Sequence, residues 1–514
     1  MKRITTLICG GIMAASCAFA QTAPPVTPVV GTTPATGTPA AAPGGRPARV
    51  LTPEQQAAAK ARTEALNADY QNMMDQLHIT TPLRPGKNGN DKKSPDYANY
   101  DETKANPYTN YPNPLIEKNG KKVTTANEWW TVRRPQIVED FNREVYGRVP
   151  KNIPKVTWSV HKDTDEVVNN IPVNLKQLVG HVDNSAYPAI KVDIQLTLMV
   201  PKSATHPVPV IMVFGGRDFL NPPPPGGGFG FGGPRPAAAP VAGAPAGAPA
   251  PGGRSGFGAP AAGPGTPQQQ VLTKGWAYAE LQTGTIQADN GGELTKGIIG
   301  LVNKGKYRKP DDWGVLRAWA WGADRALDYF ESNPAVNAKE VAIEGHSRWG
   351  KAALVSLAYD PRMATAYVSS SGEAGAKPSR RTTGEVVENI TGTSEYHWMA
   401  GNFLKYGGPL NPGDLPVDSH ELIAMCAPRP VFISGGSSGY DGQDAWVDAP
   451  GMFMACNLAG PVYTLLGKRA MAIKEYPGPL VLVPGDITFR QHSGPHTDIP
   501  NWPFFLEFAS LYFK

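Results

Sequence analysis

Short apolar runs alternate with helical patterns through most of this chain, and this alternation limits the folds that it can adopt. β-rich apolar runs occur at 155–160, 189–200, 208–214, 275–281, 339–344, 364–369, 430–434 and 479–483. Apolar residues with helical spacing occur at 128–147, 312–333, 349–358 and about 450–458. Strands that alternate with helices favour a mostly parallel sheet with helices packed on it. The sequence therefore predicts an α/β fold.

Glycine and proline, at 56 and 52 of 514 residues, exceed their usual share, and two segments hold much of the excess. Neither segment has enough large apolar side chains to offset the entropy of ordering it. We predict a disordered tether over 21–65 and a disordered insertion over 221–270. Because the β-rich runs at 208–214 and 275–281 flank the insertion, it lies inside one domain, which we expect to span 66–514.

The first twenty residues have the pattern of a signal peptide. Lys2 and Arg3 precede a mostly apolar stretch, and Ala18-Phe19-Ala20 fits a cleavage site. We therefore expect export to the periplasm or the medium, with lipidation of Cys17 as an alternative. No later apolar run is long enough to span a membrane.

Charge and cysteine content exclude several other classes of protein. The formal net charge is +5, and no basic stripe points to nucleic acid. Beyond the signal segment, Cys426 and Cys456 remain, and we expect buried free thiols, although a single disulfide is the other option. The histidines show no paired metal-binding spacing, so we expect no metal or other cofactor, and we expect a monomer.

The clearest local motif is a strand that runs directly into a serine and then a helix. Val341–Ile343 is apolar, Gly345 and Ser347 follow, and the helical pattern starts near Trp349. This is the pattern of a nucleophile elbow, in which the helix start offers backbone N–H groups to a developing oxyanion. The usual motif is G-x-S-x-G, but here the second glycine, Gly350, comes one position later. A serine at a helix start is also a common N-cap.

Two basic residues follow this serine. The Arg348 guanidinium can direct donors at an oxyanion. Lys351 lies four residues after Ser347, so both are on one helix face. Its ammonium can point toward the mouth of a site or be a solvated surface group.

A catalytic triad also needs a carboxylate and a histidine, in the order Ser, Asp or Glu, His. After the strand at 430–434, a loop carries Asp441, Asp444 and Asp448. After the strand that ends near 484, the chain carries His492 and His496. We favour His496 as the base, because a Gly-Pro pair fixes the turn just before it.

Together these residues make the chain resemble the glucuronoyl esterases, carbohydrate esterase family 15. The segment Gly345–Lys351 matches the G-x-S-R-x-G-K signature, and the resemblance covers roughly 110–514 apart from the insertion. The other matching segments are Asp311–Gly314, Ala318–Gly322, Ser371–Gly372, Ser379–Arg381, Gly401–Phe403, Leu415–His420, Ala427–Pro430 and Asp444–Trp446. The resemblance implies an α/β-hydrolase fold, a three-layer sandwich, with 66–514 as its catalytic domain.

The resemblance also implies roles for individual residues. Ser347 would be the nucleophile, His496 the base and Arg348 an oxyanion-stabilising residue, while Lys351 and Trp446 would contact the uronic acid sugar.

The resemblance assigns the acid of the triad less directly than the serine and the histidine. Many members place a glutamate where this chain has Ser370, whereas other bacterial members take the acid from a later loop. This points to Asp444, with Asp448 second and Glu373 third.

The activity implied is two-step acyl transfer on the ester between 4-O-methyl-glucuronic acid of xylan and lignin alcohols. Two alternatives remain. One is a serine esterase acting on an acetyl or methyl ester of another polysaccharide. The other is a non-catalytic carbohydrate-binding descendant, suggested by Ser370 in place of glutamate.

Overall fold

The computed structural model describes residues 52–222, 265–437 and 444–514. The predicted signal peptide, residues 21–51 of the predicted tether, most of the predicted insertion and Asp441 lie outside these ranges. Contacts divide the chain into two units, Met1–Pro53 and Glu54–Lys514, and the fold described below is that of the second. Within the described ranges, no helix combines the length and the apolar character that crossing a bilayer requires.

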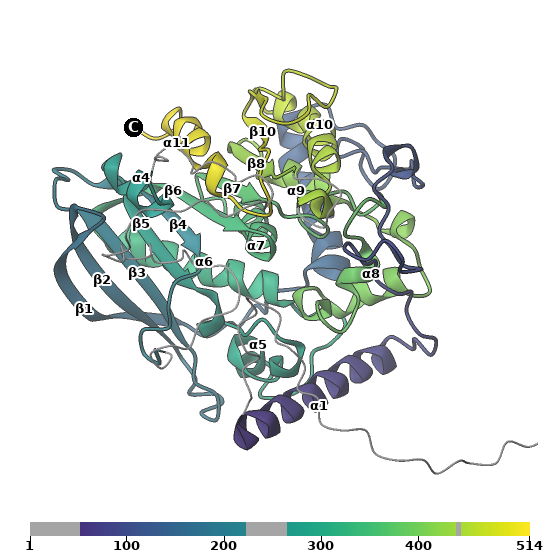
Figure 1. The fold of residues 1–514 in the computed structure, drawn as a ribbon, viewed down its shortest axis with the longest axis horizontal. Coiled ribbons are helices and arrows are strands. Elements are labelled where there is room, and N and C mark those ends of the chain that lie inside the picture. The colour runs from purple at the N-terminus through teal and green to yellow at the C-terminus, as the bar shows by residue number, and fades with distance from the viewer. Residues whose placement is uncertain (1–51, 223–264, 438–443) are drawn as a thin grey trace, which may run out of the picture. The chain divides into compact units, whose positions relative to one another are not determined.

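A ten-stranded sheet forms the centre of the fold, in the order β1-β2-β3-β5-β4-β6-β7-β8-β10-β9 (Figure 1). The six strands β5-β4-β6-β7-β8-β10 pair with one another in parallel. On one side β1, β2 and β3 extend the sheet by antiparallel pairing as far as β5, and on the other side β9 pairs antiparallel with β10. The strand bounds are β1 Val156–Val168, β2 Ile171–Val182, β3 Asp193–Pro201, β4 Val208–Phe214, β5 Ala277–Gln282, β6 Val336–His346, β7 Thr365–Ser369, β8 Val431–Gly435, β9 Leu482–Val483 and β10 Ile487–Gln491. The predicted mostly parallel α/β sheet is confirmed.

Helices cover both faces of this sheet. The α-helices are α1 Pro53–Gln76, α2 Ala126–Glu128, α3 Arg134–Asp140, α4 Pro267–Thr273, α5 Gly297–Val302, α6 Val315–Ser332, α7 Arg348–Tyr359, α8 Val387–Ile390, α9 Ser419–Cys426, α10 Ala449–Leu465 and α11 Trp502–Ser510. The regions predicted as helices at 312–333, 349–358 and 450–458 correspond to α6, α7 and α10.

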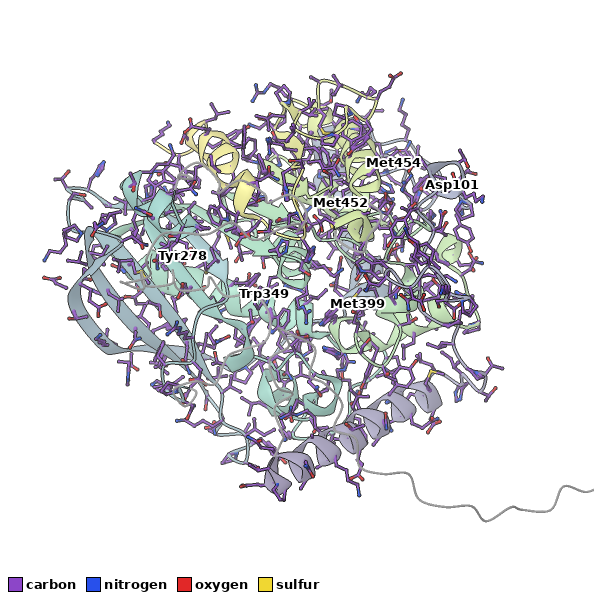
Figure 2. All side chains as sticks on the ribbon, in the orientation of Figure 1. Asp101, Tyr278, Trp349, Met399, Met452 and Met454 are labelled. Atoms are coloured by element: carbon purple, nitrogen blue, oxygen red, sulfur yellow. The ribbon has the colours of Figure 1, made fainter. Side chains whose placement is uncertain are left out.

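Alternate residues of each strand enter different layers, because side chains point to opposite faces of a strand. Val210 and Met212 of β4 join a core with α6, α7, α9 and α10, whereas Ile211 and Val213 join a second core with α4 and α11. The labelled side chain of Met452 belongs to the first core (Figure 2). The result is the three-layer sandwich of an α/β-hydrolase.

The structure corrects the predicted ends of the tether and of the insertion. Residues 53–65, which the composition places in the tether, form the first part of α1, and the buried Met73 and Met74 near the end of this helix pack into the core. Residues 267–270, which we placed in the insertion, begin α4, whose Thr266 side chain caps it by accepting from Gln269 N. β4 and β5 on either side of the insertion are parallel neighbours, as expected for an insertion within a domain.

The last strands were predicted less well. The strand predicted at 479–483 is only Leu482–Val483, and the sequence reading missed β10, which pairs in parallel with β8. β10 is fully buried although it carries Thr488 and Arg490, because both have polar partners: the carbonyl of Gly485 and the side chain of Asn501. Its sequence therefore lacks the apolar run by which buried strands are recognised. Among the described residues, Cys426 and Cys456 are free and buried, as expected, and form no disulfide.

Candidate active site

The candidate site lies where four adjacent parallel strands end. Ser347 follows β6, Ser370 follows β7, Gly436 follows β8 and His492 follows β10. In parallel α/β sheets, the carboxyl ends of the strands form the edge at which ligands bind. The order of these strands therefore brings together residues from positions 347 to 496 at one edge of the sheet.

Ser347 occupies a sharp turn between β6 and α7. Its φ of +60° is strained for a residue with a side chain, and its backbone N–H donates to the carbonyl of Ser369 at 2.9 Å. The serine side chain makes no capping hydrogen bond to α7. The turn therefore has the geometry of a nucleophile elbow and not that of a serine N-cap.

Both glycines of the motif sit where no Cβ fits. A Cβ on Gly345 would lie 2.1 Å from the carbonyl oxygen of Trp349, and one on Gly350 would lie 2.6 Å from that of Ser369. Gly350 is thus the point where α7 touches the end of β7. The later position of the second glycine still serves close packing of the helix on the sheet.

His496 and Asp444 form a close pair. His496 Nδ1 lies 2.5 Å from Asp444 Oδ1, and the Asp444 carboxylate is fully buried. Its other oxygen accepts from Ser370 Oγ at 2.5 Å and from the backbone N–H of Gly436. Burial alone would raise the pKa of Asp444, but the hydrogen bonds and the nearby His496 lower it below its ordinary value. Asp444 is therefore ionised and holds the His496 ring by its Nδ1–H.

The loop that carries His496 is shaped by His492. His492 Nδ1 accepts from Gly494 N at 3.0 Å, and Nε2 donates to the carbonyl of Thr497 at 2.7 Å. Both ring nitrogens of His492 are occupied within its own loop, so His492 is the structural histidine of the two.

A third histidine, His346, directly precedes Ser347. Its ring centre lies 4.2 Å from that of His496. Burial, together with the charge of the nearby His496, lowers the pKa of His346 to about 4.

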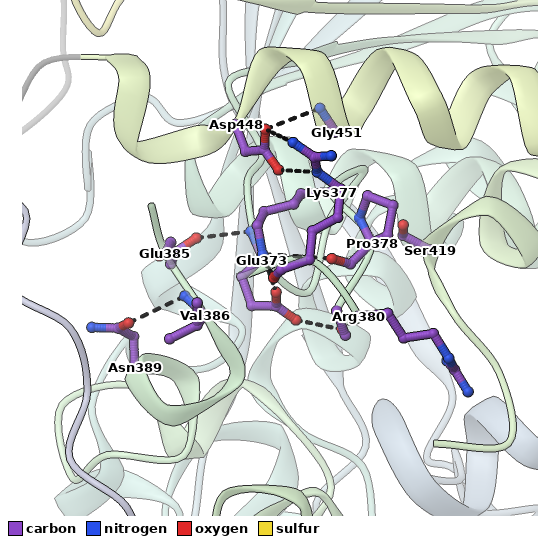
Figure 3. Close-up of polar contacts among 12 residues, drawn as sticks. Glu373, Lys377, Pro378, Arg380, Glu385, Val386, Asn389, Ser419, Asp448 and Gly451 are labelled. Atoms are coloured by element: carbon purple, nitrogen blue, oxygen red, sulfur yellow. Dashed lines mark hydrogen bonds and ion pairs between the residues drawn. The ribbon is translucent and has the colours of Figure 1, made fainter. Parts of the chain in front are cut away.

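The other two candidate acids are engaged elsewhere (Figure 3). Asp448 caps α10 through Gly451 N and forms a two-point ion pair with Arg381, at 2.6 and 3.0 Å. Glu373 pairs with Lys377 at 2.9 Å in a fully buried contact. Of the three carboxylates, Asp444 is the one that the structure places against His496.

Arg348 lies beside the serine with a defined set of contacts. Its NH1 donates to Asp289 Oδ2 at 2.7 Å, and its guanidinium lies over the Trp398 ring at 5.4 Å from the ring centre. The side chain remains 40% exposed, so it is open to the solvent side of the site. The sequence reading missed Asp289, which belongs to no motif and lies 59 residues away from its partner.

Lys351 differs from the expectation of a group at the mouth of the site. Its side chain is 4% exposed, and the ammonium donates to the carbonyls of Ser371 and Glu373 at 2.8 and 2.5 Å and to Glu385 Oε2 at 2.8 Å. All three of its protons are therefore used inside the protein. The ammonium thus lies neither at the mouth of the site nor in solvent, because the chain after β7 covers this part of α7.

Trp446 lies two residues after Asp444, in the short helix η9 (Asp444–Val447). Its half-buried ring packs against Gly89, where a Cβ would lie 2.6 Å from the ring, and its carbonyl accepts from Glu385 N at 2.8 Å. The ring contact with Gly89 and the backbone hydrogen bond from Glu385 therefore hold this residue in place, two residues after the acid.

A second Ser-His-Asp set lies on the antiparallel part of the sheet and provides a contrast. Ser159 Oγ is 2.9 Å from His181 Nε2, and His181 Nδ1 is 2.8 Å from Asp193 Oδ1. Ser159 lies in the middle of β1 and not at a helix start, so no helix N–H groups stand beside it. A hydrogen-bonded His-Asp pair thus does not by itself distinguish the candidate active site from the Ser159 set. The turn between β6 and α7 at Ser347 does, because the Ser159 set has no such turn.

Comparisons with known proteins agree with this geometry. A family model described as "Glucuronyl esterase, fungi" matches residues 268–467. A carbohydrate esterase of an unknown prokaryotic organism is 30% identical over 80% of this chain and 91% of its own length. The 4-O-methyl-glucuronoyl methylesterase 1 of Wolfiporia cocos is 35% identical over 30% of this chain and 38% of its own length.

A solved structure extends the likeness to the fold. A glucuronoyl esterase of carbohydrate esterase family 15 from Teredinibacter turnerae is 36% identical, with a TM-score of 0.74 over 87% of this chain and 99% of that one. The likeness therefore covers most of this chain and nearly all of that one. The chain therefore belongs to carbohydrate esterase family 15, the glucuronoyl esterases, and is a carboxylic ester hydrolase.

Proposed function

We propose that this protein is a secreted serine esterase that cleaves the ester between glucuronic acid, or its 4-O-methyl form, on xylan and the alcohols of lignin. The reaction passes through an acyl-enzyme on Ser347. The observation that carries the proposal is the contact of His496 with the buried Asp444, 2.5 Å apart at the sheet edge where Ser347 directly precedes α7. The name of the Wolfiporia cocos relative supports the choice of a glucuronate ester.

His496 acts as the base. Because ionised Asp444 can only accept, His496 donates to it through Nδ1–H, and Nε2 keeps a lone pair for the serine proton. Ser347 Oγ has no hydrogen-bond partner among the described residues, and in free enzymes such contacts often tighten only when substrate binds. Ser347 Oγ bonds to the ester carbon as its proton passes to His496.

The oxyanion forms next to two kinds of donor. The backbone N–H groups at the start of α7 point toward it, and Arg348 supplies a permanent positive charge from its partly exposed side chain. His496 then gives its proton to the leaving alcohol as the C–O bond breaks. Water repeats the sequence and releases free glucuronate from Ser347.

The sugar is held beside these groups. Trp446, fixed two residues from Asp444, offers a ring on which the C–H face of a sugar can stack and exclude water. Lys351 does not contact the sugar directly. Its buried ammonium instead orders the segment after β7 and the Glu385 carboxylate through hydrogen bonds.

The test is hydrolysis of benzyl glucuronate beside an aryl acetate. Wild type should cleave the glucuronate, and Ser347→Ala should lower kcat by about 10⁴-fold or more, because the nucleophile is gone. Ser159→Ala is the matched control: it also removes a serine that is hydrogen-bonded to a His-Asp pair, and it should change kcat by less than about 2-fold. Inert glucuronate with fast acetate cleavage would overturn the proposed substrate.

A broader ester specificity is the second candidate, and one relative favours it. A marine metagenome structure that is 27% identical, with a TM-score of 0.63 over 80% of this chain, is described as a promiscuous esterase of the same family. Comparable kcat/KM on both esters, with both activities lost in Ser347→Ala, would support a broader specificity.

Secretion is tested separately. N-terminal sequencing of the exported protein should give a sequence that starts at Gln21, and an uncleaved N-terminus would contradict the predicted signal peptide.

A further inference from the structure

Asp289 holds three donors with one carboxylate. Its Oδ2 accepts from Arg348 NH1 at 2.7 Å, and its Oδ1 accepts from Trp398 Nε1 at 2.6 Å and from His397 Nε2 at 2.9 Å. Trp398 also lies under the Arg348 guanidinium. The arginine is therefore fixed at its edge by Asp289 and along its face by a ring that the same carboxylate holds.

This arrangement restricts a side chain that would otherwise be free. Arginine has about 2 kcal/mol of rotamer entropy, and Arg348 is 40% exposed. Stabilisation of an oxyanion depends on donors that already point to where the charge will develop. Among the described residues, NH1 is the one nitrogen of Arg348 with a protein partner, so its other donors stay available for substrate.

The loop that carries Asp289 is itself anchored. Gln287, fully buried two residues earlier, accepts from Trp319 Nε1 of α6 through its carbonyl at 2.9 Å and bonds Ile299 N of α5 through its side chain at 3.0 Å. On the other side, Tyr396, next to His397, donates to Asp69 of α1 at 2.8 Å. The carboxylate is thus tied to α1, α5 and α6 and is not a flexible surface group.

The charge of Asp289 is also secured. Burial alone would raise its pKa, but the hydrogen bond from His397 and the positive charge of Arg348 lower it well below the ordinary aspartate value. Asp289 is therefore ionised at neutral pH, and its ion pair with Arg348 is formed there.

We propose that Asp289 is a positioning residue that fixes the Arg348 guanidinium in the direction of the oxyanion. This inference rests on the oxyanion role of Arg348 given under the proposed function. Asp289 touches neither the nucleophile nor the base and acts on the reaction through Arg348 alone. Its removal should therefore affect the rate of the chemical step and not the binding of the ground-state ester.

A double-mutant cycle on benzyl glucuronate tests this. Loss of a whole oxyanion donor costs about 10²–10³-fold in kcat. Asp289→Ala, which misaligns the donor, should cost about 10–100-fold, with KM within about 2-fold of wild type. In an Arg348→Ala background, Asp289→Ala should cost less than about 3-fold more, because the group that it positions is absent.

Two further variants separate positioning from general damage. Asp289→Asn keeps one oxygen acceptor, which can face Arg348 while the amide NH2 takes the place of the oxygen beside Trp398 and His397. It should lose only about 3–10-fold in kcat, which is a partial rescue. Asp328→Ala, on α6, breaks another aspartate–arginine pair, in which Asp328 lies 2.8 Å from Arg362, and should leave kcat within about 2-fold of wild type. Thermal unfolding of each variant checks that the fold is intact.

Three results would overturn the inference. One is an equal loss from Asp289→Ala with and without Arg348; another is a loss carried by KM alone. The third is a wild-type rate for Asp289→Ala while Arg348→Ala is slow. If Arg348→Ala itself is as fast as wild type, the oxyanion role in the proposed function fails, and that outcome is visible without any Asp289 variant.

Discussion

At the scale of single residues, the two oxygens of Asp444 have different tasks. One faces His496, and the other is held by Ser370 Oγ and the backbone of Gly436. By the resemblance to the family, Ser370 stands where many members have a glutamate. In this chain Ser370 donates a hydrogen bond to Asp444, the acid that takes the place of that glutamate.

Replacing Ser370 by alanine should weaken the triad without removing a member. A hydrogen bond to a charged group contributes about 1.5–3 kcal/mol, and Gly436 N–H remains, so we expect kcat to fall about 10-fold. Ser356→Ala is the control, because Ser356 is also buried but bonds only within α7. An unchanged kcat on benzyl glucuronate for Ser370→Ala would contradict this role.

Glu344, on β6 two residues before His346, should make stability depend on pH. Burial raises its pKa well above the ordinary value, with the Asp498 charge adding to the effect, so the folded protein keeps a proton that the unfolded chain releases. The folded state then binds more protons than the unfolded state between the two pKa values, and stability falls as pH rises through that window.

Glu344→Gln cannot ionise and should therefore lose less stability than wild type on going from pH 6 to pH 9. Thermal unfolding of both proteins at the two pH values measures this. Parallel changes in Tm would show that Glu344 does not titrate differently in the folded protein.

Residue roles were predictable only where a motif carried them. Ser347 and Asp444 could be singled out from spacing and resemblance, and the structure places Asp444 against His496 as expected. Asp289 could not be found, because its partners Arg348 and Trp398 are distant in sequence and the loop has no signature. The burial of Lys351 could not be predicted, because it depends on a later segment folding over this residue.

At the scale of elements, the elbow depends on contact between α7 and β7. Gly350→Ala should destabilise the protein by about 1–3 kcal/mol, because its Cβ would collide with the Ser369 carbonyl, although alanine normally favours a helix. Gly284→Ala is the matched control, since the nearest atom to its Cβ is 3.7 Å away. Denaturant unfolding measures both; an equal effect of the two variants would contradict this account of the motif.

The strands and helices of the parallel core could be predicted from periodicity, and their ends were mostly within a few residues. β10 could not, because the burial of its Arg490 depends on a tertiary partner, the side chain of Asn501. Residues 53–65 are polar and alanine-rich, so their composition predicts a tether although they form part of α1. The helix is held on the protein by Met73 and Met74 near its end, which are buried in the core.

At the scale of the whole molecule, the sheet does not depend on the segment between β4 and β5. The two strands pair directly, and α4 begins before β5. Replacing 223–264 by a short Gly/Ser linker should therefore keep the fold, and each halving of loop length should add about 0.6 kcal/mol of stability. We expect kcat on benzyl glucuronate within about 2-fold of wild type, because every residue of the proposed mechanism lies outside the segment. A lower Tm or a 10-fold fall in kcat would contradict this expectation.

The central claim is that one serine, set in its turn by the meeting of β6, β7 and α7, carries the acyl group. The most direct measurement is mass spectrometry of peptides from enzyme quenched in acid during turnover of an aryl glucuronate. The good leaving group of this ester makes deacylation the slow step, so the intermediate accumulates. We predict one glucuronoyl group on the peptide that contains Ser347 and none in Ser347→Ala. Turnover with that peptide unmodified and the group on another residue would contradict the account.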